Sequence, residues 1–227
     1  MMSKIVEHRE EGSVRVAAGS VMLEGQLNGT EGAKGVVVFA HGGGSSRFSP
    51  RNQYVAGILR DRALATLLID LLTEEEEVVD LRTAELRFDI GLLAERLIGA
   101  TSWLQREAQT RQLKVGYFGA STGAAAALMA AAKLPKNARA VVSRGGRPDL
   151  AGTALDNIRA PTLLIVGGND VPVIGLNRDA LDRLRCEKKL EIVPGATHLF
   201  EEPGALEKVA ALACEWFDRY LSSEPKE

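Results

Sequence analysis

The sequence has few of the features that mark specialised classes of protein. Its 227 residues hold 2 cysteines, Cys186 and Cys214, too few for a disulfide framework or a zinc site. No apolar run approaches the roughly 20 residues that span a bilayer, and residues 1–12 lack the apolar core of a secretory signal. The net charge of −2 favours neither a nucleic acid nor an anionic membrane as partner. We therefore expect a cytoplasmic protein.

What the chain does have is an alternation of strand-like and helix-like segments. Short, nearly all-apolar runs, typical of strands covered on both faces, occur at Val36–Ala40, Ala65–Ile69, Val115–Phe118, Ala140–Ser143 and Thr162–Val166. A more polar run, Leu190–Val193, is typical of an edge strand. Helical spacing of apolar residues lies between these runs, at Gln53–Arg60, Leu86–Gln105, Thr122–Ala132, Leu176–Arg185 and Ala205–Leu221.

This alternation predicts a three-layer α/β sandwich, a mostly parallel sheet with helices on both faces, formed by residues 1–227 as one domain. Two alternating segments, Ser13–Ala18 and Val21–Leu27, predict an N-terminal antiparallel hairpin. We expect residues 1–12 to be poorly ordered. For the acidic run Glu74–Glu77 we expect a solvated loop, with a mobile flap as the alternative. The 17 residues from Arg144 to Ala160 leave no room for an inserted cap domain.

Ser121 is the candidate nucleophile. It lies in Gly119-Ala120-Ser121-Thr122-Gly123, between a predicted strand and a predicted helix. A GxSxG motif in that context forms a sharp turn that exposes the serine hydroxyl at the carboxyl end of the sheet. The small glycines let strand and helix approach closely. The alternative, a glycine-rich turn of no chemical meaning, explains the context less well.

A serine needs a base, and the base needs an acid that orients it. In this kind of fold the three residues follow the chain order serine, acid, histidine. Of the three histidines, only His198 follows Ser121, in a turn between the last strand and the last helix. Asp170 is the one acidic residue that directly follows a buried strand in that interval. An Asx-turn or helix-capping role is its alternative.

The segment His41-Gly42-Gly43-Gly44-Ser45-Ser46-Arg47 follows the strand Val36–Ala40 and is the candidate oxyanion loop. We predict that the N–H groups of Thr122 and Gly43 form the oxyanion hole, with Gly44 close by. His41 is interpreted as a structural residue of the loop. A flexible or phosphate-cradling loop is the alternative, although the Lys-Ser/Thr ending of a P-loop is absent.

Together these motifs resemble the dienelactone hydrolase-like branch of the α/β-hydrolase superfamily. More narrowly, HGGGSSRFSPRN, FGASTGAAAAL, VVSRGGRPDLAG and PTLLIVGGND resemble the hydrolase domain found fused to phosphoribosyltransferases. The resemblance runs from about Val14 to Leu221 and implies a serine hydrolase. Dienelactone hydrolases proper use a cysteine nucleophile, whereas this chain has Ser121, which favours ordinary carboxylic esters as substrates.

The sequence therefore predicts a carboxylesterase that acts on small or short-chain esters through an acyl-enzyme. We expect no metal and no cofactor, no nucleic-acid or membrane partner, and a monomer or homodimer. Arg47 and Arg144 follow strand ends and are possible substrate-binding residues, or they pair with nearby acids such as Asp70 and Asp149. The alternatives are a lactone, thioester or amide hydrolase, and a ligand-binding protein without activity.

Overall fold

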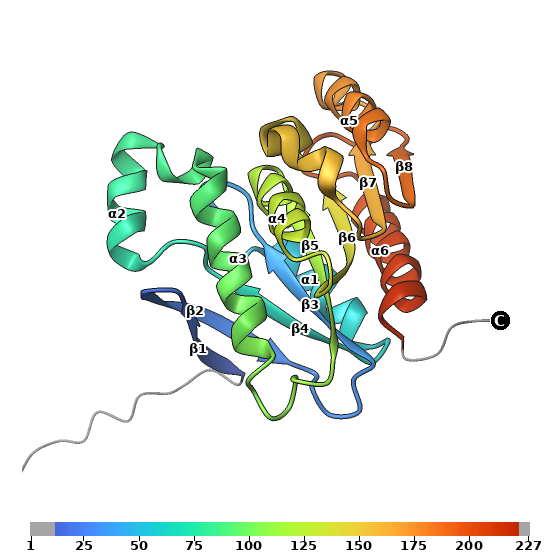
Figure 1. Ribbon diagram of the computed structural model, residues 1–227. Helices are drawn as coiled ribbons and strands as arrows, with labels where there is room; N and C mark the ends of the chain where they lie inside the picture. Colours follow the sequence, from blue (N-terminus) through green and yellow to red (C-terminus); the bar gives the residue numbers. More distant parts are fainter. Residues whose placement is uncertain (1–11, 223–227) are drawn as a thin grey trace, which may run out of the picture.

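The computed structural model describes residues 12–222, which form an eight-stranded sheet with helices on both faces (Figure 1). The expectation for residues 1–12 lies, apart from Gly12, outside the described residues. The strands are β1 (Ser13–Ala18), β2 (Val21–Asn28), β3 (Gly35–Ala40), β4 (Leu64–Ile69), β5 (Lys114–Ala120), β6 (Ala138–Arg144), β7 (Thr162–Gly167) and β8 (Lys188–Val193). Their order in the sheet is β1-β2-β4-β3-β5-β6-β7-β8.

The hairpin β1–β2 is antiparallel and joins the sheet through an antiparallel pairing of β2 with β4, whereas β3 to β8 are parallel. In β3, β4 and β7 each residue is buried, which is why these strands are apolar without alternation. The edge strand β8 is largely exposed or half-buried. The predicted fold, a mostly parallel α/β sandwich with an N-terminal hairpin, is confirmed.

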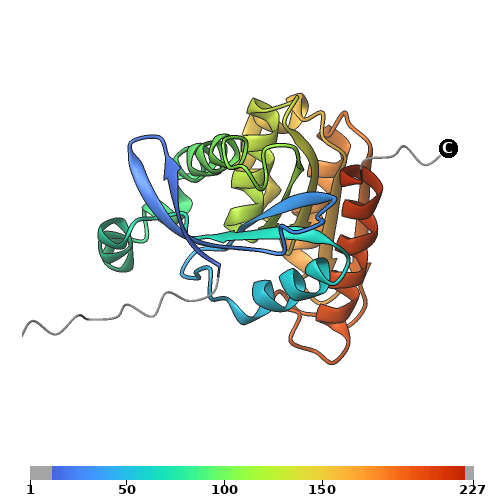
Figure 2. The same cartoon turned by 90° about the horizontal axis from the view of Figure 1, so that it is seen from below.

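The helices form two layers (Figure 2). One layer packs on the sheet with α3 (Ile90–Leu104), α4 (Thr122–Lys133), the 3-10 segment η2 (Pro148–Asn157) and α5 (Val171–Arg183). The other layer consists of α1 (Pro50–Arg60) and α6 (Ala205–Leu221). In the described part of the chain the crossover from β6 to β7 holds only η2, so no cap domain covers the carboxyl end of the sheet. Within the same range, none of the helices combines the length and apolar character that crossing a membrane requires.

The prediction of a loop at Glu74–Glu77 was wrong, because these residues begin the helix α2 (Glu74–Thr83). Thr73 caps it: its hydroxyl accepts from the Glu76 N–H at 3.2 Å, and the Glu76 carboxylate accepts from the Thr73 N–H at 2.9 Å. Four glutamates in the first turn also complement the positive end of the helix dipole. Figure 1 shows α2 standing away from the sheet beside α3.

The predicted helix Leu86–Gln105 is divided in two. A 3-10 turn, η1 (Leu86–Phe88), precedes α3, and Asp89 separates them because its carboxylate accepts from the Leu92 N–H at 2.9 Å. A capping aspartate begins a new helix and so ends the old register. The break turns η1 toward the carboxyl end of the sheet, where the candidate site lies.

Candidate active site

Ser121 occupies the turn between β5 and α4 with φ 50° and ψ −120°, a backbone conformation that residues other than glycine rarely adopt. Its N–H donates to the Arg144 carbonyl at 3.3 Å, and its carbonyl accepts from the Arg147 N–H at 3.1 Å. The turn is therefore held to the end of β6 on both sides of the serine. Local strain of this kind is typical of a functional site.

The two glycines of the motif are required by close packing. A Cβ at Gly119 would clash with the backbone of Ala124, and one at Gly123 would clash with the carbonyl oxygens of Ala40 and His41. Strand β5, helix α4 and the end of β3 thus meet around the serine at distances that only glycine allows. The spacing of GxSxG is explained by this contact of three elements.

The structure brings Asp170 and His198 together from the ends of β7 and β8. The imidazole Nδ1 lies 2.6 Å from Asp170 Oδ2, and the Asp170 side chain is largely buried while that of His198 is 38% exposed. A hydrogen bond donated by Nδ1 leaves Nε2 without a proton, as a general base requires. Asp170 does not cap α5 through its side chain, because its carboxylate makes no hydrogen bond to the first turn of that helix.

Gly145 lies between the serine and the histidine and was not found by sequence reasoning. It follows Arg144 with φ 52°, and a Cβ there would lie 3.4 Å from both Cε1 and Nδ1 of His198. The glycine therefore lets the imidazole approach the end of β6, to which the Ser121 turn is bonded. The double glycine after Arg144 was the available signal.

The candidate oxyanion loop follows β3 and approaches the serine closely: a Cβ at Gly42 would lie 3.1 Å from the Ser121 Cβ. The Gly43 N–H donates to the Thr122 hydroxyl oxygen at 3.0 Å, and Gly44 has φ 70°. The two predicted oxyanion donors, Gly43 and Thr122, are thus neighbours.

His41 and Arg47 hold the two ends of this loop. The His41 Nδ1–H donates to the Gly42 carbonyl at 2.9 Å, and Nε2 accepts from the Leu71 N–H at 3.1 Å. Arg47 forms an ion pair with Asp70, and the Arg47 N–H donates to the same carboxylate at 2.6 Å. The Arg47 guanidinium is therefore engaged in bracing the loop.

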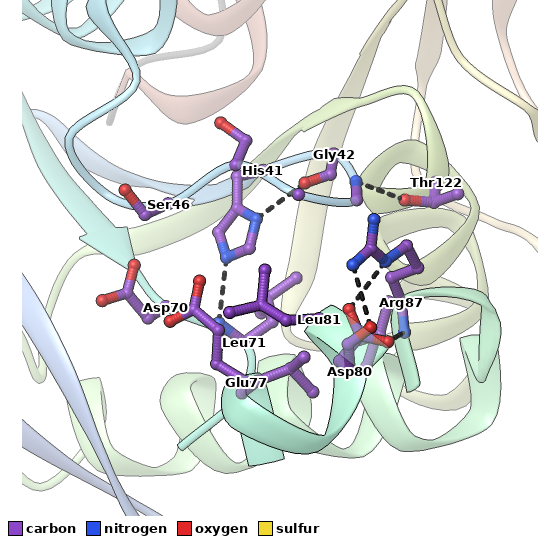
Figure 3. A pocket seen from close by; sticks show the side chains of 15 residues that line it. His41, Gly42, Ser46, Asp70, Leu71, Glu77, Asp80, Leu81, Arg87 and Thr122 are labelled. Atoms are coloured by element: carbon purple, nitrogen blue, oxygen red, sulfur yellow. Dashed lines mark hydrogen bonds and ion pairs between the residues drawn. The ribbon is translucent and has the colours of Figure 1, made fainter. Parts of the chain in front are cut away.

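A cavity that opens to solvent lies beside the loop (Figure 3). One wall is the segment from His41 to Ser46 with Thr122, and the other includes Leu81 of α2 and Arg87 of η1. Leucines at 71, 72 and 93 make much of the remaining lining. Asp70 and Glu77 also line the cavity, and α2 forms part of its rim.

Arg87 and Asp80 connect the rim to the oxyanion loop, and sequence reasoning found neither. The Asp80 carboxylate accepts from the Arg87 N–H at 2.9 Å and from Nε at 2.7 Å (Figure 3). The Arg87 stem packs on Gly43, where a Cβ would lie 3.1 Å from the arginine Cδ. Burial raises the pKa of Asp80, but the hydrogen bonds from Arg87 outweigh it and hold that pKa below its usual value.

Arg144 differs from Arg47 because it has no acidic partner among residues 12–222. Its side chain ends 5.9 Å from the Phe200 ring centre, and its Nε is buried without a hydrogen bond. Arg147, three residues on, pairs with Asp149 at 2.7 Å. Of the two arginines predicted as possible substrate residues, Arg144 is thus the one without an acidic partner in the described residues, and its guanidinium lies over the Phe200 ring.

The sheet order and the strained serine turn after β5 are those of the α/β-hydrolase fold. A sequence model of the dienelactone hydrolase family matches residues 75–223, and the chain belongs to this family. Its fold is also that of a dienelactone hydrolase from Anabaena variabilis ATCC 29413, with 64% identity and a TM-score of 0.91 over 93% of this chain and 98% of that one.

Two further comparisons add a curated relative and a solved structure with the same fold. A Mycobacterium tuberculosis protein named as a phosphoribosyl transferase is 58% identical over 208 residues, which are 92% of this chain and 46% of that protein. The chain thus spans about half the length of the curated relatives it matches. Est1E from Butyrivibrio proteoclasticus has a TM-score of 0.75 at 14% identity, covering 91% of this chain and 98% of that one, and shares the fold.

Proposed function

We propose that this protein hydrolyses carboxylic esters through Ser121, His198 and Asp170. The observation that carries the proposal is the Asp170–His198 hydrogen bond of 2.6 Å beside a serine held at φ 50°. The pair orients an imidazole whose free nitrogen can take a proton, and Gly145 lets that imidazole approach the end of β6 to which the serine is bonded. A serine hydroxyl becomes a nucleophile when such a base is within reach.

In the proposed reaction, Ser121 Oγ attacks the ester carbonyl while His198 Nε2 takes the hydroxyl proton. The tetrahedral intermediate then collapses, the bond to the alcohol oxygen breaks, and the imidazolium gives its proton to that oxygen. Water, activated by the same imidazole, hydrolyses the acyl-enzyme and restores Ser121. Asp170 keeps the imidazole in its tautomer and stabilises the imidazolium without taking the proton.

The negative charge of the intermediate develops on the carbonyl oxygen, and N–H groups at the start of α4 are its stabilisers. The Thr122 N–H begins this helix, where the dipole is positive. The Gly43 N–H is the second proposed donor. In the structure it donates to the Thr122 hydroxyl oxygen, so it must either turn toward the oxyanion or divide its hydrogen bond between the two oxygens. Removing one such donor from a hydrolase costs about 10²–10³ in kcat.

The cavity beside the oxyanion loop is the proposed site for the acyl group. Its lining includes four leucines, and Thr122 at the start of α4 also lines it. Its charged lining residues are Asp70, Glu77, Asp80 and Arg87, and the last two are bonded to each other. An acyl chain placed there keeps the alcohol part of the ester on the other side of Ser121.

The test is hydrolysis of p-nitrophenyl esters from acetate to octanoate by the wild type and by Ser121→Ala. We expect activity on the shorter chains and a loss of about 10⁶-fold in kcat for the variant. Absence of wild-type activity on each chain length, or full activity of Ser121→Ala, would contradict the proposal. Parallel assays with a thioester, an anilide and a lactone of the same acyl length show whether the enzyme prefers esters or one of the other bonds that this triad can hydrolyse.

A further inference from the structure

Arg144 carries a buried charge over the ring of Phe200 and pairs with no carboxylate in the described part of the chain. The residue is 7% exposed, its Nε is buried without a hydrogen bond, and no carboxylate within residues 12–222 forms an ion pair with it. Arg96 is equally buried, at 7%, but its guanidinium lies 2.5 Å from Glu76. Because a buried charge without a partner is costly, proteins rarely keep one unless it binds something.

A second cation adds to this charge. Arg51, in the first turn of α1, also has a buried Nε without a hydrogen bond, and its one ion pair, at 3.1 Å, is with Glu201, whose side chain is 64% exposed. Burial, and after it the charge of Arg51, lowers the pKa of Arg144 to about 10. Arg144 therefore still carries its proton at neutral pH.

The two arginines lie on the opposite side of the sheet from the acyl cavity. Along β6, Ala140 and Val142 pack with α1 and α6, and Arg144 continues this face toward Phe200, two residues after His198. Leu71 and Leu93 of the cavity belong instead to the core under α3 and α4. Ser121, whose N–H donates to the Arg144 carbonyl at 3.3 Å, lies between the two.

The chemistry of the proposed reaction says which part of the substrate meets each side. His198 gives its proton to the departing alcohol oxygen, so the alcohol part must lie next to the imidazole. Phe200 and Arg144 lie just beyond that imidazole. We infer that Arg144, assisted by Arg51, binds an anionic group, a carboxylate or a phosphate, on the alcohol part of an ester whose acyl part is apolar.

This inference rests on the proposed ester hydrolysis and can be tested separately from it. Three substrates vary the alcohol part: the butyryl esters of 4-hydroxybenzoate, 4-hydroxyphenyl phosphate and neutral 4-hydroxybenzamide. Two more vary the acyl part: phenyl hemisuccinate carries an anion there, and phenyl butyrate does not. The variant is Arg144→Met, which keeps the length of the side chain and removes its charge. Arg147→Gln is the matched control, because Arg147 lies in the same loop and is paired with Asp149.

We expect Arg144→Met to lower kcat/KM about 10- to 100-fold for the benzoate or the phosphate ester, through a higher KM. The kcat/KM for the amide ester should stay nearly unchanged. So should the ratio of kcat/KM for the hemisuccinate to that for the butyrate. The larger of the two anionic effects identifies the anion. Arg144→Lys should restore part of the preference. The melting temperature of Arg144→Met should stay the same or rise, because an unpaired buried charge has been removed.

Equal effects on the anionic and neutral alcohol esters overturn the inference, and so does a loss confined to the hemisuccinate, which would place the anion on the acyl part. A lower melting temperature with equal kinetic effects assigns Arg144 a structural role only. Hydrolysis of the neutral ester and labelling of Ser121 by a fluorophosphonate report the proposed function by themselves. If both fail in the wild type, the proposed function is wrong, whereas an unchanged anion ratio with both intact contradicts the inference alone.

Discussion

The turn around Ser121 and the α2–η1 segment line the same cavity, but they are built in opposite ways. The turn is packed so closely that Gly119 and Gly123 have no room for a Cβ. In α2–η1 the apolar side chains of Val78, Val79, Leu81 and Phe88 are 50–71% exposed, and the main anchors are the ion pairs Asp80–Arg87 and Glu76–Arg96.

The difference separates two tasks. A site for bond breaking needs its groups held in one geometry, which close backbone packing provides. The proposed wall for the acyl group should tolerate change, because few of its side chains are buried and the core does not depend on them. We therefore expect substitutions in the turn to alter folding and catalysis, and substitutions in α2 to alter the choice of substrate.

The largest effect should come from Gly123→Ala. Its methyl group would clash with the carbonyl oxygens of Ala40 and His41, so β3, the oxyanion loop and α4 would have to move apart. We expect a loss of about 3 kcal/mol in the free energy of unfolding, measured by urea denaturation, and loss of esterase activity.

Gly175→Ala is the matched control for that experiment. Gly175 lies within α5, and a Cβ there meets nothing within 4 Å. The same substitution should therefore stabilise the protein by about 0.5–1 kcal/mol. Similar effects at the two glycines would contradict the account of the turn.

A smaller effect, on specificity alone, is expected for Leu81→Gln. Leu81 is 71% exposed, yet it lines the proposed acyl cavity, so kcat/KM for a hexanoate ester should fall about 10-fold relative to acetate. The free energy of unfolding should change by no more than about 0.5 kcal/mol. Val79→Gln, on the same helix but outside the cavity lining, should leave the ratio of the two esters unchanged, and an equal change in both variants would remove α2 from the acyl site.

The smallest effect should appear at low pH. The pKa of Asp80 is lowered in the folded protein, so its contribution to stability is present above the unfolded value near 4 and is lost as the pH falls through the folded value. Urea denaturation between neutral pH and about pH 3 should show a shallower decline for Asp80→Asn than for the wild type. Asp156→Asn, which removes an exposed ion pair to Arg183, should change the slope less, and a steeper decline in Asp80→Asn would contradict the sign of the shift.

Local sequence patterns were enough to predict the eight strands, since buried parallel strands are apolar without interruption and turns separate them. They did not predict α2, because its four glutamates hide any apolar periodicity. The signal was the capping box, Thr73 followed by Glu76 three residues later. The break before α3 had a similar local signal in Asp89.

Only those parts of the site could be predicted that follow from the order of the strands along the chain. Asp170 and His198 follow strands that end at the same edge of a parallel sheet, so their meeting follows from topology. The contact of Arg87 with Gly43 does not, because it depends on how far α2 and η1 fold back over the loop. The sequence likewise could not decide which of Arg47 and Arg144 forms an ion pair, because this depends on which carboxylate lies within reach of each side chain.

The central claim is that Ser121 is a nucleophile activated by His198 and Asp170, and a fluorophosphonate probe tests it most directly. Peptide mapping of the labelled protein should place the adduct on Ser121 in the wild type, none should form in Ser121→Ala, and labelling of Asp170→Asn should be slower by about 10⁴-fold. An adduct on another residue, or a folded wild type that stays unlabelled while still hydrolysing esters, would contradict the account.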